Sequence, residues 1–299
     1  MSIKLKDIIN TIWRYKRAYR NWMKVLFIMA IKRGASHHEN INIKVVVRNG
    51  ESLVVPYGWA SIYSRLINIK NLKISEIKLI PNGISFKYNG LPITIDPAIF
   101  SDPDSVFFHE DYKFLEVKNK DVIDVGMNIG DSSIYFSING AKRVIGLEPY
   151  PYSFSFAEKN IKLNNIKNII LINAGYGNDS KITISENISS SGSNLVVSSI
   201  GKEISIYSLK SLIDKYNIRN GVLKMDCEGC EYALLNEDDE VFNNIWMIQI
   251  EYHYGCENLV NKLKSVGFDV KYTKPKQSYN SYAENPNMEV GYIYAKRAT

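Results

Sequence analysis

Acidic residues and glycines gather in one short stretch after a predicted strand. From Asp124 to Ser132 the sequence reads Asp-Val-Gly-Met-Asn-Ile-Gly-Asp-Ser and leads into a predicted helix. A glycine-rich turn at such a junction lets the backbone approach a ligand closely, because glycine has no β-carbon. Asn128 and Asp131 stand where a dinucleotide fingerprint has its second and third glycines, which disfavours a pyrophosphate. An acidic rim suits a ligand with a cationic group, such as a sulfonium or an ammonium.

A second carboxylate closes the next predicted strand. Glu148 can accept hydrogen bonds from both hydroxyls of a ribose. Either motif alone could be an ordinary capped turn, but together they predict an S-adenosylmethionine site. The third strand ends without an acid, so the Asn173 amide oxygen or a backbone carbonyl is expected to meet the adenine amine. The expected cofactor-binding residues are Asp124, Gly126, Asn128, Gly130, Asp131, Glu148 and Asn173.

Four further titratable residues follow two other predicted strands. Asp226 and Glu228 share one side of an extended segment, as do Glu251 and His253. Because the carboxyl ends of parallel strands meet at one edge of a sheet, these four residues are expected to converge there. A carboxylate or imidazole at this place could take the proton of a methyl-accepting hydroxyl. The alternative is that these strand-end acids only cap the next helix.

Metal binding is a separate possibility. The pairs Cys227-x-x-Cys230 and His253-x-x-Cys256 have spacings typical of zinc ligands, and clustered carboxylates can recruit a divalent metal. Cys227 is expected to point away from Asp226, and small buried cysteines are common, so we assign no metal ligands from the sequence.

Strands and helices alternate from about residue 106 onward, which is typical of a mostly parallel sheet covered on both faces. The predicted strands are 121–125, 143–147, 169–173, 222–226, 246–251, 268–272 and 291–295. Helices are expected to begin near Ser132, Ser153, Ser208, Cys230 and Glu257, and residues 185–201 are expected to form a loop or hairpin.

The N-terminal third divides into two predicted parts. Residues 1–33 carry nine Lys or Arg and one acid, whereas the rest of the chain has a net charge of −2. Apolar residues in this leader recur at helical spacing, which predicts a basic amphipathic helix that either lies on anionic lipid or packs on its own domain or a partner chain. Its longest uncharged run, 25–31, is too short to cross a bilayer.

Residues 34–105 read as short strands separated by Asn-Gly turns and predict a small β-rich domain, with His37 and His38 in a linker.

The third predicted domain is 106–299, and within it about residues 106–295 resemble the FkbM family of S-adenosylmethionine-dependent methyltransferases. The resemblance rests on the 124–131 and 146–149 motifs, on Asn160–Asn165, and above all on Leu223-Lys-Met-Asp-Cys-Glu-Gly-Cys-Glu231. It implies a class I (Rossmann-like) α/β fold with seven strands, the last antiparallel, and O-methylation of a hydroxyl on a sugar, glycolipid or polyketide. On that reading Asp124, Gly126, Asn128, Gly130 and Glu148 bind the cofactor.

The expected function is therefore O-methylation of a carbohydrate or glycolipid. The alternatives are an RNA methyltransferase that uses the basic leader, and a cofactor-binding interaction module without catalysis. The nearest match to the Asn-Pro-Pro-aromatic element of amine methylation is Asn285-Pro-Asn287, which lacks the second proline. With three cysteines and no apparent secretory signal, the chain is expected in the cytoplasm, with peripheral membrane contact or oligomerisation through 1–33.

Overall fold

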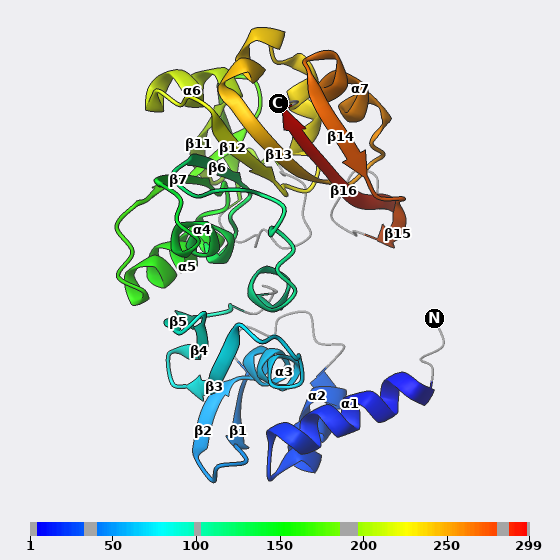
Figure 1. The fold of residues 1–299 in the computed structure, drawn as a ribbon. Coiled ribbons are helices and arrows are strands. Elements are labelled where there is room, and N and C mark those ends of the chain that lie inside the picture. The colour runs from blue at the N-terminus through cyan, green and yellow to red at the C-terminus, as the bar shows by residue number, and fades with distance from the viewer. Residues whose placement is uncertain (1–4, 33–40, 99–102, 186–196, 280–286, 298–299) are drawn as a thin grey trace. The chain divides into compact units, whose positions relative to one another are not determined.

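The computed structural model describes residues 5–32, 41–98, 103–185, 197–279 and 287–297 (Figure 1). The chain divides into two compact units, residues 1–110 and 111–299. His37 and His38, most of the 185–201 segment and most of the Asn285-Pro-Asn287 motif lie outside the described residues.

The second unit is built on a twisted sheet whose strand order is β14-β16-β13-β12-β6-β7-β8. Neighbours from β13 to β8 are parallel, and β16 is antiparallel to both β13 and β14. This is the class I methyltransferase fold that the sequence predicted. The bounds are β6 Asp121–Val125, β7 Arg143–Leu147, β8 Ile169–Ile172, β12 Gly221–Met225, β13 Ile245–Tyr252, β14 Phe268–Tyr272 and β16 Asn287–Arg297. A short strand, β15 (Lys276–Tyr279), pairs with the start of β16.

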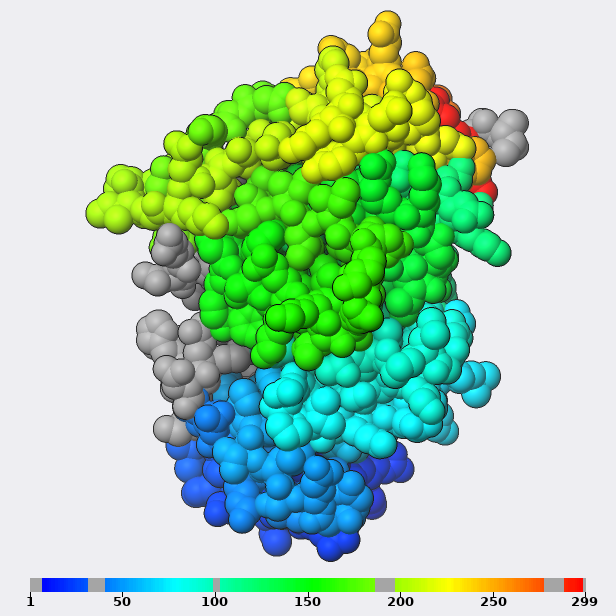
Figure 2. Space-filling model, turned by 90° about the vertical axis from the view of Figure 1, so that its left-hand side faces the viewer, coloured from blue at the N-terminus to red at the C-terminus, as the bar shows by residue number. Residues whose placement is uncertain are grey.

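Helices cover both faces of this sheet, as Figure 1 shows. One face carries α4 (Asp131–Ile138) and α5 (Pro151–Leu163), whose residues belong to the green surface in the middle of Figure 2. The other face carries α6 (Leu209–Tyr216) and α7 (Glu257–Ser265), which share an apolar core with the central strands. The side chain of Ser208 caps α6 by accepting a hydrogen bond from the backbone amide of Ser211, as its position in the sequence predicted.

Several smaller elements of this unit were not predicted. Strands β9 (Ala174–Tyr176), β10 (Ser180–Ile184) and β11 (Lys202–Tyr207) form a separate sheet beside the main one. Two 3-10 helices, η2 (Cys230–Asn236) and η3 (Asp239–Asn244), precede β13. The predicted helix after Cys230 is therefore a 3-10 helix. Short elements of this kind carry too few residues for a periodic sequence signal.

The first unit combines helices with two small antiparallel sheets. Strands β1 (Asn42–Val46) and β2 (Ser52–Pro56) form a hairpin, and β3 (Ile74–Ile80), β4 (Gly83–Tyr88) and β5 (Leu91–Ile95) form a meander. The sequence pattern predicts strands at 41–48, 52–55, 76–80, 84–88 and 93–95, and each overlaps one of these five strands. Helix α3 (Tyr57–Leu66), which packs its buried residues against them, was missed, and so was a short π-helix, η1 (Asp104–Phe108).

The prediction of one helix over residues 1–33 is wrong. The leader forms two helices, α1 (Leu5–Ala18) and α2 (Trp22–Lys32), with a break at residues 19–21. The break occurs because Tyr19 leaves the helix to pair with Val47, while the backbone amide of Arg20 donates to the carbonyl of Val46. Tyr19 is fully buried, and its hydroxyl donates to the carbonyl of Ala60 at 2.9 Å. A tertiary contact thus overrides the continuous helical pattern.

Part of the apolar surface of these two helices is not covered within the unit. Tyr15, Ala18 and Val25 are buried, but other large apolar side chains remain exposed. The exposed set is Ile8, Ile9, Ile12 and Trp13 on α1 and Met23, Phe27 and Ile31 on α2. In the described part of the chain no helix combines the length and apolar character needed to cross a membrane.

Candidate active site

The turn after β6 brings the backbone of two neighbouring strand ends together. Gly126 has a φ of +73°, and a β-carbon there would lie 1.9 Å from the carbonyl oxygen of Asp226, so only glycine fits. Gly130, with a φ of +82°, begins α4 and packs against Ala157. The two glycines predicted to shape this turn are therefore required by its geometry. The turn places the start of α4 beside the end of β12.

A buried ion pair lies directly beneath this turn. Nζ of Lys224 on β12 is 3.1 Å from a carboxylate oxygen of Asp124 on β6, and both side chains are at most 1% exposed. Lys224 also donates to the carbonyl of Gly126 at 2.7 Å. The hydroxyls of Ser132 and Ser133 donate to the other oxygen of Asp124 at 2.7 and 2.6 Å. Burial alone would lower the pKa of Lys224, but the Asp124 and Asp226 carboxylates outweigh it and raise that pKa.

Asp124 thus has a different place from the one expected. We predicted it among the cofactor-binding residues, but it is fully enclosed, and its contacts are to Lys224 and the serine hydroxyls of α4. An ionised carboxylate at such depth is stable only beside a positive charge and hydrogen-bond donors. Its role in the structure is to position the turn.

Glu148 occupies the end of β7, next to the turn. Its two carboxylate oxygens accept hydrogen bonds from the backbone amides of Asn128 (3.1 Å) and Tyr150 (3.0 Å). Each oxygen keeps a second lone pair, so the carboxylate can still accept from a ribose hydroxyl. Burial raises the pKa of Glu148 to about 7. Burial likewise raises the pKa of Asp131, at the first position of α4, to about 7.

Asn173 contacts protein groups on both sides of its amide. Its nitrogen donates to the carbonyls of Glu148 and Pro149, and its oxygen accepts from Lys202 at 2.7 Å. We expected either this oxygen or a backbone carbonyl to meet an adenine amine. In the structure Asn173 holds the backbone that carries Glu148.

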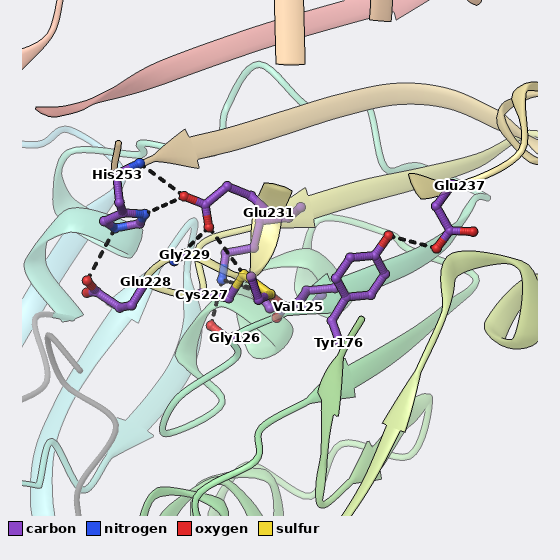
Figure 3. The surroundings of a disulfide bond; sticks show 12 residues. Val125, Gly126, Tyr176, Cys227, Glu228, Gly229, Glu231, Glu237 and His253 are labelled. Carbon is purple, nitrogen blue, oxygen red and sulfur yellow. Dashed lines mark hydrogen bonds and ion pairs between the residues drawn. A yellow bond between two sulfur atoms is a disulfide. The ribbon is translucent and has the colours of Figure 1, made fainter. Parts of the chain in front are cut away.

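The acceptor cluster, which we define as Asp226, Glu228, Glu251 and His253, lies at the ends of β12 and β13. One ligand-type atom from each of Asp226, Glu251 and His253 lies within 4.8 Å of the other two. Nε2 of His253 is 3.4 Å from a carboxylate oxygen of Glu228 (Figure 3). The structure therefore brings together the four side chains that sequence reasoning placed at one sheet edge.

Glu231 orients the imidazole of this cluster. It is fully buried, and one of its oxygens lies 2.9 Å from Nδ1 of His253 and accepts the backbone amide of His253 at 3.0 Å (Figure 3). Its other oxygen accepts the backbone amide of Gly229 at 2.8 Å. With Nδ1 held by Glu231, Nε2 faces the carboxylate of Glu228.

The loop between these residues is closed by a disulfide between Cys227 and Cys230 (Figure 3). The possibility of zinc bound by these cysteines is therefore contradicted, because the two sulfurs are bonded to each other and neither is a thiolate. The remaining cysteine, Cys256, is free and buried. Within the loop Glu228 and Gly229 both have positive φ values, which aims the Glu228 side chain at His253.

Electrostatics couple the members of the cluster. Burial, followed by the neighbouring Asp226 carboxylate, raises the pKa of Glu251 to about 8. Burial acts to lower the pKa of His253, but the hydrogen bond and charge of Glu231, with Glu228 and Asp226, raise it to about 10. Two tyrosines complete the surroundings: Tyr112 donates to Asp226 at 3.2 Å, and Tyr292 is hydrogen-bonded to Glu251.

Comparison with known proteins identifies the kind of domain that has this arrangement. Residues 124–270 match the family described as the methyltransferase FkbM domain. The chain carries an FkbM methyltransferase domain. S-adenosylmethionine is accordingly its cofactor, and the acidic turn and the Glu148 carboxylate fit a nucleoside with a cationic centre.

Similarity to individual proteins covers a short part of the chain or is low in sequence identity. A curated protein named as a protein N5-glutamine methyltransferase, from Methanocaldococcus jannaschii, is 33% identical over 78 residues, which is 26% of this chain and 39% of the relative. Among solved structures, TYW2 from M. jannaschii in complex with AdoMet is 17% identical and has a TM-score of 0.40. The match covers 74% of this chain and 89% of the TYW2 chain. An rRNA methylase from Streptococcus thermophilus is 11% identical and has a TM-score of 0.40; the match covers 65% of this chain and 96% of the methylase.

Some residues of the FkbM domain site had no predicted role. Lys224 and Glu231 stood inside the quoted motif without an assigned function, and Tyr112 and Tyr292 lay outside every motif. An Asp and a Lys on adjacent strands could have suggested a buried pair, because each stands between two apolar residues of its strand. The two tyrosines reach the site through tertiary structure alone.

Removal of the Lys224 charge is expected to destabilise the domain severely. Lys224→Met leaves Asp124 charged and buried, which costs about 3–5 kcal/mol of unfolding free energy. Urea denaturation measures this, and Asp124→Asn in the Lys224→Met background should recover part of the loss. Lys181→Met, which breaks an exposed pair with Glu203, is the control and should leave the urea midpoint nearly unchanged. Equal effects of the two single substitutions would contradict the ion pair's role.

Cofactor affinity is expected to depend on pH through Glu148. Below pH 7 the carboxyl is protonated in the free protein, so binding of ribose hydroxyls to the carboxylate requires loss of a proton. We expect S-adenosylhomocysteine to bind about 10-fold more weakly at pH 6 than at pH 8, as measured by calorimetry. Glu148→Gln should weaken S-adenosylhomocysteine binding and make its affinity less dependent on pH. Asp131→Asn shows how much of the pH dependence comes from Asp131, whose pKa is also raised to about 7. An unchanged pH profile in Glu148→Gln would refute the assignment.

Proposed function

We propose that this protein is an S-adenosylmethionine-dependent O-methyltransferase that acts on a hydroxyl of a carbohydrate or glycolipid. The proposal is supported mainly by the acceptor cluster. Its four titratable side chains lie beside the Gly126 turn, which we expect to bind the cofactor. An oxygen acceptor must lose a proton during methyl transfer, and the cluster offers groups that can take it.

The cofactor supplies a methyl group on a sulfonium, and the electrons of the broken carbon–sulfur bond remain on sulfur as a thioether. The acceptor oxygen forms the new carbon–oxygen bond with one of its lone pairs. Its proton passes to the Glu228 carboxylate, which we propose as the base because its side chain is 22% exposed and can release the proton to water. Asp226, Glu251 and His253 orient the hydroxyl beside it.

The surroundings of the cluster favour a polar acceptor. Carboxylates, an imidazole and two tyrosine hydroxyls are groups that hydrogen-bond to several hydroxyls at once, as a sugar offers them. Amide methylation, named for the curated relative, has less support, because the nearest match in this chain to the Asn-Pro-Pro-aromatic element lacks the second proline.

An RNA acceptor has weaker support from the charge distribution. The positive charge of this chain is concentrated in residues 1–33, and the rest has a net charge of −2. A cluster of carboxylates would repel the phosphates of a nucleic acid. A role without catalysis is disfavoured too, because convergent carboxylates are costly to keep together when no reaction uses them.

Helices α1 and α2 support contact with an anionic lipid surface, which would favour a glycolipid acceptor. Met23, Phe27 and Ile31 recur every four residues along α2 and are each at least 60% exposed. On α1, Trp13 is 56% exposed and lies under the ammonium of Lys16. Exposed apolar side chains beside cations are the pattern of helices that lie in a lipid interface.

Replacement of the proposed base should slow the reaction without affecting the cofactor. Glu228→Gln keeps the size of the side chain and removes its basicity, so we expect kcat to fall about 100-fold or more while S-adenosylhomocysteine affinity stays within about 2-fold. Transfer of labelled methyl groups to fractionated glycan and lipid extracts measures activity. Asp269→Asn, a change of the same size on the exposed surface of β14, should leave both values unchanged. Full activity in Glu228→Gln would remove it as the base.

Lipid contact can be tested on vesicles. The full chain is expected to co-sediment with vesicles that contain phosphatidylserine and to remain in solution with neutral ones. Phe27→Glu should reduce binding strongly, whereas Leu72→Glu, at a fully exposed apolar residue of the same unit, serves as the control. Equal sedimentation of the two variants would contradict a lipid role for α2, and a concentration-dependent dimer lost only in Phe27→Glu would assign the surface to a second copy.

A further inference from the structure

We propose that Asp226, Glu251 and His253 bind a divalent cation of the Mn²⁺ type, and that this cation holds the acceptor hydroxyl. The inference rests on the proposed function for its chemical role, but the binding site is argued from the residues alone. Two carboxylates and one imidazole form a donor set that suits Mn²⁺ and related divalent ions. One donor atom from each residue lies within 4.8 Å of the other two. In an octahedral site neighbouring donors lie about 3 Å apart and opposite ones about 4 Å, so only small side-chain movements are needed.

The orientation of His253 is the second observation. Metal-binding histidines commonly donate their other ring N–H to a carboxylate, which fixes the tautomer and the ring plane. Glu231 is fully buried and lies 2.9 Å from Nδ1 of His253, and it also accepts the backbone amide of the same residue. This arrangement leaves Nε2, the atom a metal would use, facing the Glu228 carboxylate (Figure 3).

The charge balance points to a cation as well. In the described ranges of the chain no Lys or Arg forms an ion pair with Asp226 or Glu251. Tyr112 and Tyr292 contact these two carboxylates through neutral hydroxyls. The nearest cationic groups are Lys224, which is paired with Asp124, and His253, which is paired with Glu228 and Glu231. Gln249 precedes Glu251 by two residues on β13 and so lies on the same face of the strand. Its amide oxygen is buried and has no hydrogen-bond donor among the described residues. A hydrated dication would balance the carboxylates, and its bound water could donate to such an acceptor.

The location fits a role in the reaction. Gly126, whose backbone lies against the carbonyl of Asp226, belongs to the turn that receives the cofactor, so a cation on Asp226 lies beside that turn. A hydroxyl bound to a cation loses its proton more readily, because the positive charge stabilises the alkoxide. The proton passes to Glu228, and the oxygen lone pair so exposed attacks the methyl carbon, with sulfur leaving as the thioether. No oxidant or reductant is required.

Direct measurement of Mn²⁺ binding tests the site without any acceptor. The full chain is treated with a chelator, dialysed and titrated with MnCl₂, with free Mn²⁺ followed by electron paramagnetic resonance. We expect one Mn²⁺ per chain. Asp226→Asn and His253→Gln should each weaken binding by at least about 10-fold to 100-fold, and Glu231→Gln should weaken it by about 10-fold although it is not a ligand. Asp269→Asn is the control and should bind as the unaltered chain does.

The outcomes separate this inference from the proposed function. Mn²⁺ bound equally by the unaltered chain and by Asp226→Asn, with both folded by circular dichroism, would be surface binding and would overturn the site. Methyl transfer that persists undiminished in chelator would overturn the cation's role while leaving O-methylation intact. Stoichiometric Mn²⁺ that depends on the three ligands, with no methyl transfer to any hydroxyl acceptor, would support the site and contradict the proposed acceptor.

Discussion

The ion pair between Asp124 and Lys224 is the interaction on which the site depends. It joins the central strands β6 and β12 at a depth where neither charge reaches water, and such a pair is tolerated when further hydrogen bonds support both charges. Those hydrogen bonds connect to the rest of the site. Lys224 holds the carbonyl of Gly126, and Asp124 holds two hydroxyls at the start of α4. The pair therefore fixes the cofactor turn from below.

The same pair links the two halves of the site. Asp226 follows Lys224 by two residues and so lies on the same face of the sheet, at the end of β12. The Gly126 turn rests against its backbone. The Gly126 turn and Asp226 can thus keep a constant distance from each other, because one buried ion pair positions both. Methyl transfer needs a fixed distance between cofactor and acceptor, since the methyl carbon must lie in line between sulfur and the acceptor oxygen.

Sequence alone predicted the sheet of the second unit well and its site in part. The strands were recognisable because short, mostly apolar runs such as Ile169–Ile172 alternate with predicted helices. The acceptor cluster was predicted because its residues follow strand ends that share an edge. The roles of Asp124 and Asn173 were not predictable in this way, because both look like ligands of a cofactor until their neighbours are known. Burial of Asp124 depends on Lys224, which lies 100 residues later in the chain. The break between α1 and α2 is of the same kind, since Tyr19 leaves a good helical pattern for a contact with Val47.

A crystal structure of the complex with S-adenosylhomocysteine tests the central claim most directly. The account predicts the ribose hydroxyls on the Glu148 carboxylate, the nucleoside against the Gly126 turn and the sulfur directed toward Asp226. A nucleoside bound elsewhere, or a sulfur that points away from the end of β12, would contradict it.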